Sequence, residues 1–125
     1  MTSEFDFDSA AARIKKRDTE RHLEREALFK KAVENCKEIV EMIKTEFTPS
    51  RIYQWGSLLR PDQFDENSDI DIAVEGLGTA EKFFSMYGKA LEIARFKLDI
   101  IELEKIDQID RESIIKRGKL VYERS

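Results

Sequence analysis

The longest pattern along the chain is helical. No Gly or Pro occurs between residues 9 and 48, and apolar residues in the second half of this stretch recur at intervals of three and four, as on one buried helix face. We expect Asp8 or Ser9 to cap the helix, Thr48 and Pro49 to end it, and its second half to pack on the core. The apolar stripe consists of Leu28, Ala32, Cys36, Ile39, Val40, Ile43 and Phe47.

The first half of this helix has almost no apolar face. Residues 13–26 read RIKKRDTERHLERE, and arginines recur there every four residues as one basic ridge, made of Arg13, Arg17, Arg21 and Arg25. Two interpretations stay open, a solvated surface with internal ion pairs and a docking surface for an acidic partner or RNA. We therefore divide the chain into a charged N-terminal helical extension, residues 1–27, and a domain of residues 28–125.

Short runs of strand character follow the helix. Residues 51–55 are apolar and bulky, and residues 69–74 alternate between polar and apolar positions, which predicts a strand with one buried face. Residues 96–103 and 119–122 have the composition of two further strands.

Helical patterns separate these strands. Thr79 is placed to cap a helix whose apolar stripe consists of Phe83, Tyr87, Ala90, Leu91 and Ala94. Asp110 is placed to cap a second, shorter helix over 111–117, which Gly118 ends. Together the elements predict an α/β (α+β) fold.

Composition and charge narrow the class of protein. The 125 residues are 41% hydrophobic and 38% charged, enough for one core. Net charge is -4, which disfavours a general nucleic-acid binder, although residues 13–31 hold eight Lys/Arg against four Asp/Glu. The single cysteine, Cys36, excludes an internal disulfide, and no apolar run approaches the roughly 20 residues of a membrane span. We expect a cytoplasmic protein with no membrane contact.

Candidate chemistry is concentrated between residues 56 and 99. Asp69 and Asp71 fall on one face of the expected strand, where two carboxylates repel each other unless a cation joins them. Asp99 lies inside a third apolar strand, where a buried charge is costly without a positive partner. Oxygen-only ligation suits Mg²⁺ or Mn²⁺.

A neighbouring turn completes the candidate site. Gly56 and Ser57 form a turn whose free backbone N–H groups and hydroxyl could hold phosphate.

An EF-hand beginning at Asp65 is excluded, because its sixth position is Ile70 and its twelfth is Gly76. The lone His22 makes a zinc site or a nucleophilic triad improbable.

The order Gly56-Ser57, then Asp69-Ile70-Asp71, then Asp99 within KLDII resembles the nucleotidyltransferase superfamily typified by DNA polymerase β, and especially its minimal nucleotidyltransferase branch. The similarity covers roughly residues 28–124 and includes the closing IIKRGKLVYE. It implies the nucleotidyltransferase fold, with a small mixed β-sheet flanked by helices. Leu58 and Leu59 depart from the resemblance, because more polar residues often follow the Gly-Ser pair.

The resemblance also implies roles for single residues. Asp69 and Asp71 would hold two Mg²⁺ ions (or Mn²⁺) that bind the triphosphate of ATP or another NTP, and Asp99 would complete the site for the second ion. Gly56 and Ser57 would grip the terminal phosphates, and Arg60 could touch phosphate. The catalytic and metal-binding residues expected on this basis are Asp69, Asp71 and Asp99, and the nucleotide-binding residues are Gly56, Ser57 and Arg60.

Stand-alone domains of this branch often act as antitoxins paired with a HEPN-type toxin. The expected activity is therefore transfer of a nucleoside monophosphate, AMP from ATP, to a hydroxyl on such a partner, with release of pyrophosphate. The alternative is a catalytically silent protein that binds a nucleotide or a partner. No general nucleic-acid binding is expected, and an oligomer stays possible.

Overall fold

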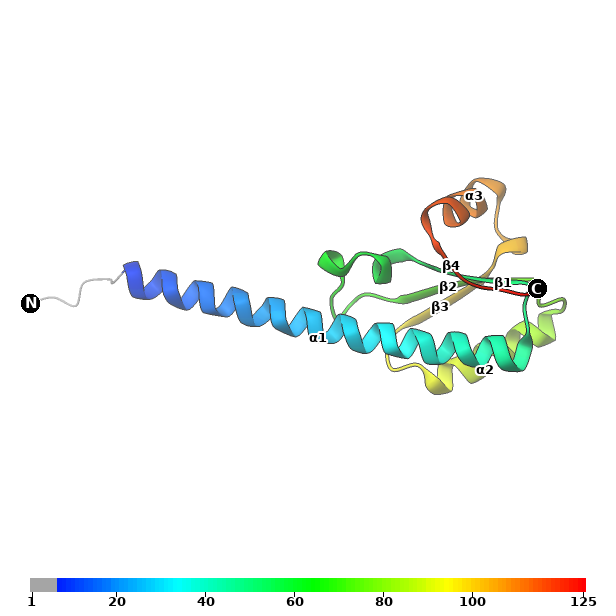
Figure 1. Ribbon diagram of the computed structural model, residues 1–125, viewed down its shortest axis with the longest axis horizontal. Helices are drawn as coiled ribbons and strands as arrows, with labels where there is room; N and C mark the ends of the chain where they lie inside the picture. Colours follow the sequence, from blue (N-terminus) through cyan, green and yellow to red (C-terminus); the bar gives the residue numbers. More distant parts are fainter. Residues whose placement is uncertain (1–6) are drawn as a thin grey trace, which may run out of the picture.

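The structure, a computed structural model, describes residues 7–125. Three helices and four strands alternate along the chain, with three short 3₁₀ turns between them (Figure 1). In chain order they are α1 (Phe7–Phe47), β1 (Arg51–Trp55), η1 (Gly56–Leu59), η2 (Pro61–Gln63), β2 (Ile70–Glu75), α2 (Ala80–Ile93), β3 (Leu98–Glu102), η3 (Leu103–Lys105), α3 (Gln108–Arg117) and β4 (Lys119–Glu123).

The strands form one mixed sheet in the order β3-β2-β1-β4. β1 is antiparallel to both β2 and β4, whereas β2 and β3 run parallel and are joined through α2. A parallel pair requires such a crossover connection, and a helix usually supplies it. The α/β class with a mixed sheet flanked by helices is confirmed.

The two faces of the sheet are covered by different helices (Figure 1). Ile70, Ile72 and Val74 of β2 pack in the main core with α1 and α2. Ala73, which points to the opposite face, packs with Ile114 of α3 in a smaller cluster. The face of β2 toward α1 and α2 is therefore fully buried, whereas the face toward α3 is buried at Ala73 and partly exposed at Asp71 and Glu75.

The second half of α1 packs as its apolar stripe predicts. Ala32, Ile39 and Ile43 are fully buried, and Leu28 is the first residue of the stripe to be half-buried. Every residue from Ala11 to Ala27 is exposed, and this part of α1 projects beyond the sheet (Figure 1). Residues 1–6 of the expected extension lie outside the described residues.

One buried polar residue of α1 fixes this helix to the end of α2. Asn35 is fully buried. Its amide Nδ2 donates to the Ile93 carbonyl at 3.1 Å, and its Oδ1 accepts from the Arg95 backbone N–H at 2.7 Å. The Ile93 carbonyl is one of the acceptors that the C-terminus of α2 leaves unpaired, and the Arg95 N–H follows just beyond the helix, so Asn35 pairs backbone groups on both sides of the helix end.

The caps and stripes of the helices were predicted in part. Thr79 caps α2 as expected, its hydroxyl accepting from the Lys82 N–H at 3.1 Å. The prediction that Leu91 is buried was wrong, since Leu91 is 57% exposed and Met86 is buried instead. The cap of α3 was also wrong: Asp107, not Asp110, accepts from the backbone, because the helix begins one turn earlier.

Two further boundaries differ from the expectation. α1 begins at Phe7, so Asp8 and Ser9 lie inside the helix and do not cap it. The strand expected over 96–103 is shorter, because Leu103 already belongs to a 3₁₀ turn that folds its side chain into the smaller core.

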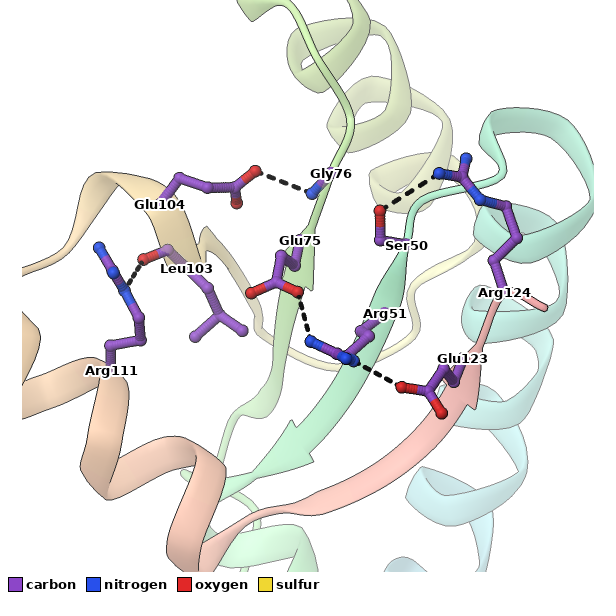
Figure 2. A network of polar contacts seen from close by, with 9 residues as sticks. All are labelled: Ser50, Arg51, Glu75, Gly76, Leu103, Glu104, Arg111, Glu123 and Arg124. Atoms are coloured by element: carbon purple, nitrogen blue, oxygen red, sulfur yellow. Dashed lines mark hydrogen bonds and ion pairs between the residues drawn. The ribbon is translucent and has the colours of Figure 1, made fainter.

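A network of polar contacts ties the strands together at the start of β1 (Figure 2). Arg51 bridges its two neighbours, donating to Glu75 of β2 at 3.0 Å and to Glu123 of β4 at 2.7 Å. Glu104 accepts from the Gly76 N–H at 2.8 Å, just beyond the end of β2. The opposite end of β1, at Trp55, leads into η1 and the candidate site.

Candidate active site

The three candidate carboxylates lie at one end of the strands, where β1 ends and β2 and β3 begin. In the parallel register Asp71 of β2 lies directly beside Asp99 of β3, and Asp71 also pairs with Trp55 of β1. Asp69 precedes β2 by one residue, and the period of two places it on the same face as Asp71. This is the α3 side of the sheet, because Ala73 and Ile101, two residues further along each strand, pack in the cluster with α3.

The electrostatics show that these carboxylates interact. Partial burial of Asp71, and then the negative charges of Asp69 and Asp99, raise the pKa of Asp71 from its ordinary 3.8 to about 6. Desolvation and like charges both disfavour the ionised form. The site therefore favours either a proton or a cation at Asp71.

The turn after β1 brings backbone against this acidic cluster. Gly56 has a φ of +78°, and a Cβ added there would lie 2.2 Å from Oδ2 of Asp71. Only glycine combines this left-handed conformation with so close an approach. The Ser57 hydroxyl donates to the Asp69 backbone carbonyl at 3.5 Å, a long contact that joins the turn to the start of β2. The fold thus brings Gly56-Ser57 and the carboxylates together.

Leu58, one of the two departures after the Gly-Ser pair, has a structural explanation. Its side chain is only 2% exposed and belongs to the main core. The 3₁₀ turn therefore directs Leu58 away from the site, and its apolar character removes no contact from the cavity.

A cavity of about 730 Å³ opens between η1 and α3. Gly56, Ser57 and Arg60, the residues expected to bind nucleotide, all line it. Arg60 is exposed at this wall and donates to Gln63 at 3.5 Å. The other lining residues are Trp55, Leu59, Gln63, Ile101, Ile106, Asp110, Ser113, Ile114, Arg117 and Gly118.

Several of these lining residues were missed from the sequence. Asp110, Ser113 and Arg117 come from α3, for which the sequence predicted no site residue and which only the tertiary fold brings opposite η1. Trp55, the last residue of the bulky apolar run 51–55, is half-buried at the cavity wall. Its indole N–H is the one buried side-chain nitrogen or oxygen group within residues 7–125 that has no hydrogen-bond partner. Such an orphaned donor is costly unless a ligand or water accepts from it.

The donor set fits a hard divalent cation. Three carboxylates on adjoining backbone positions offer only oxygen, which Mg²⁺ prefers. The raised pKa of Asp71 measures a repulsion that a cation would relieve. Across the described part of the chain, no three Asp, Glu, His or Cys side chains already converge as a closed metal cluster, so the acidic groups would adjust on binding an ion.

The fold and the position of these groups define a class of protein. A small mixed sheet with α1 and α2 on one face, α3 on the other, and carboxylates beside a Gly-Ser turn is the arrangement of a nucleotidyltransferase-type domain. The family model described as "Polymerase beta, Nucleotidyltransferase" matches residues 37–125, which is most of the chain. The chain belongs to this family.

Solved structures share the fold. The toxin–antitoxin MntA-HepT is 19% identical with a TM-score of 0.54, and the match covers 72% of this chain and 71% of that chain. A toxin–antitoxin structure with AMP-PNP is 22% identical with a TM-score of 0.59, covering 73% and 75% respectively. At these identities the likeness establishes the fold alone.

Two further findings are negative. No curated protein matches the chain. Within residues 7–125, no helix is both long enough and apolar enough to cross a membrane.

Proposed function

We propose that this chain is a Mg²⁺-dependent nucleotidyltransferase that moves AMP from ATP to a hydroxyl group on a partner protein and releases pyrophosphate. One observation carries the proposal, namely the register that sets Asp71 beside Asp99 against the backbone of Gly56. In a member of this family, that arrangement supplies carboxylates and a phosphate-binding turn at the same edge of the sheet.

The residues divide the work by position. Divalent ions held by Asp69, Asp71 and Asp99 would neutralise the triphosphate and lower the pKa of the attacking hydroxyl. The backbone at Gly56 and the Ser57 hydroxyl hold the terminal phosphates. Asp99 also accepts the proton of the acceptor hydroxyl.

The cavity beside these groups accommodates the rest of the nucleotide. Arg60 contacts phosphate from the cavity wall, and the Trp55 indole N–H donates to the bound nucleotide. Transfer of this kind depends mainly on positioning and charge neutralisation, so few side chains are required.

We further propose that the acceptor is a HEPN-type toxin and that this chain is its antitoxin. The support is the shared fold with the MntA-HepT toxin–antitoxin and with the AMP-PNP complex.

The test is label transfer. Purified chain is incubated with Mg²⁺, ATP labelled at the α-phosphate or at the γ-phosphate, and the purified product of each gene that neighbours its own. AMP transfer places the α-label on the acceptor and the γ-label in pyrophosphate. Asp71→Asn should abolish transfer, whereas Asp18→Asn, a matched change on the exposed part of α1, should leave it unchanged.

The alternative is a silent binding protein. It predicts that AMP-PNP binds with Mg²⁺ but that neither label reaches any acceptor. A γ-label on the acceptor would instead indicate a kinase and would contradict the proposed reaction.

A further inference from the structure

The exposed part of α1 is an arm that projects beyond the sheet (Figure 1). The arm comprises residues 11–27, all of them exposed, and at 1.5 Å per residue it extends about 25 Å. The family match begins only at residue 37, so the arm is an addition to the common domain. Helices that are polar on all sides usually need internal ion pairs or a partner to persist.

The arginine ridge continues the face of α1 that is buried further along. Arg21 and Arg25 precede Leu28 by seven and three residues, which places all three on one side of the helix. They line a groove of about 540 Å³ together with Glu24 and Glu66. Arg17 and Arg13 extend the same row by one and two turns.

The ridge projects from the domain at the end of the strands that carries the candidate site. Glu66 lies in the loop that leads to Asp69, and Phe64 of this loop packs edge-on against Phe29 of α1, with ring centroids 5.7 Å apart. Because α1 and β1 are joined by a tight turn and run in opposite directions, the arm projects past the end of β1 (Figure 1).

Folding gives no reason for the ridge. Like charges four residues apart on a helix destabilise it. Among the residues described, none of the four arginines pairs with a carboxylate, and the arm's one ion pair joins His22 to Glu26 at 2.9 Å. Guanidinium groups without an ion pair in the folded chain are available to carboxylates of a partner.

We propose that this ridge docks a carboxylate-rich surface of the protein that supplies the acceptor hydroxyl; this inference rests on the proposed function. A protein is favoured over RNA for two reasons. Acidic residues, Asp18, Glu20, Glu24 and Glu26, are interleaved with the arginines, and residues 11–27 contain no Phe, Tyr or Trp on which bases could stack. Docking on the arm would hold the acceptor over the edge where the carboxylates lie.

The test measures binding without nucleotide. The full chain is titrated into a fluorescent copolymer of glutamate and tyrosine, which has both carboxylates and acceptor hydroxyls, and into single-stranded RNA of equal length. The ridge variant carries Gln at Arg13, Arg17, Arg21 and Arg25. The control variant carries Gln at four exposed lysines off the ridge on the same helix, Lys15, Lys16, Lys30 and Lys37.

The ridge variant should bind the copolymer about tenfold more weakly, because four exposed ion pairs are lost, and the control within about twofold of the parent. Circular dichroism should be the same for all three. Equal loss in both variants, no loss in either, or tighter ridge-dependent binding to RNA would overturn the inference. Ridge-dependent binding without transfer of AMP to any acceptor would instead count against the proposed function and leave the docking surface standing.

Discussion

Asp71→Asn should stabilise the metal-free protein while it abolishes nucleotidyl transfer. Asp71 lies between two other carboxylates at a partly buried position, so its own negative charge opposes folding at neutral pH. Asparagine keeps the shape of the side chain and removes that charge. Residues arranged for function often carry such a stability deficit.

The magnitude follows from the pKa of Asp71. A rise from 3.8 to about 6 corresponds to about 3 kcal/mol at about 1.4 kcal/mol per pKa unit. The side chain is half-buried, so solvent screening reduces this to about 1 to 2 kcal/mol. For a chain of this size the variant should melt about 3 to 8 °C higher.

The sign of the pH dependence is fixed by the same shift. The folded protein holds the Asp71 proton more tightly than the unfolded chain does, so this group destabilises the fold progressively as pH rises from about 4 to 6. The advantage of the asparagine variant should therefore be absent at pH 4 and complete above about pH 6.

Thermal melting in EDTA at several pH values measures this advantage, with Asp18→Asn as the matched control. Added Mg²⁺ should raise the melting temperature of the parent more than that of the Asp71 variant, because only the parent keeps the full acidic site. A variant less stable than its parent at pH 7.5 in EDTA would refute the reasoning.

Three further changes test the packing. Gly56→Ala should destabilise by about 1 to 3 kcal/mol and abolish transfer, because its Cβ would collide with a carboxylate, whereas Gly78→Ala, which shares the positive φ but has open space around it, should cost less and keep transfer. In urea unfolding Asn35→Ala should cost about 2 to 3 kcal/mol, because two buried backbone groups lose their partner, against little for the exposed Asn67→Ala. Gly88→Ala should stabilise by about 0.5 to 1 kcal/mol, since this helical glycine has no neighbour within 4 Å of a Cβ.

Local patterns were enough to predict most of the fold. The alternation of residues 69–74 predicted the buried face of β2 that carries Ile70, Ile72 and Val74, and the spacing of apolar residues predicted which side of α1 meets the sheet. The predictions that failed concern residues whose burial is decided by tertiary packing. Leu91 has the spacing of a buried residue, but α2 meets α1 along Met86 and Ala90 instead.

The candidate site was predictable only where chemistry follows one strand or one turn. The sequence placed Asp69 and Asp71 on one face, and the parallel register then set Asp99 beside them. The α3 side of the cavity had no local signal, because Ser113 and Arg117 are ordinary residues of a polar helix until the chain folds back. Phe64 likewise stands among polar residues in the stretch PDQFDENS, yet it is fully buried and anchors that loop to the core.

Diffraction at the manganese edge from crystals grown with Mn²⁺ and AMP-PNP tests the central claim most directly. The account predicts anomalous peaks within about 2.2 Å of carboxylate oxygens of Asp69 and Asp71, with the terminal phosphates against Gly56 and Ser57. A nucleotide bound elsewhere, or bound there without manganese at these aspartates, would contradict it.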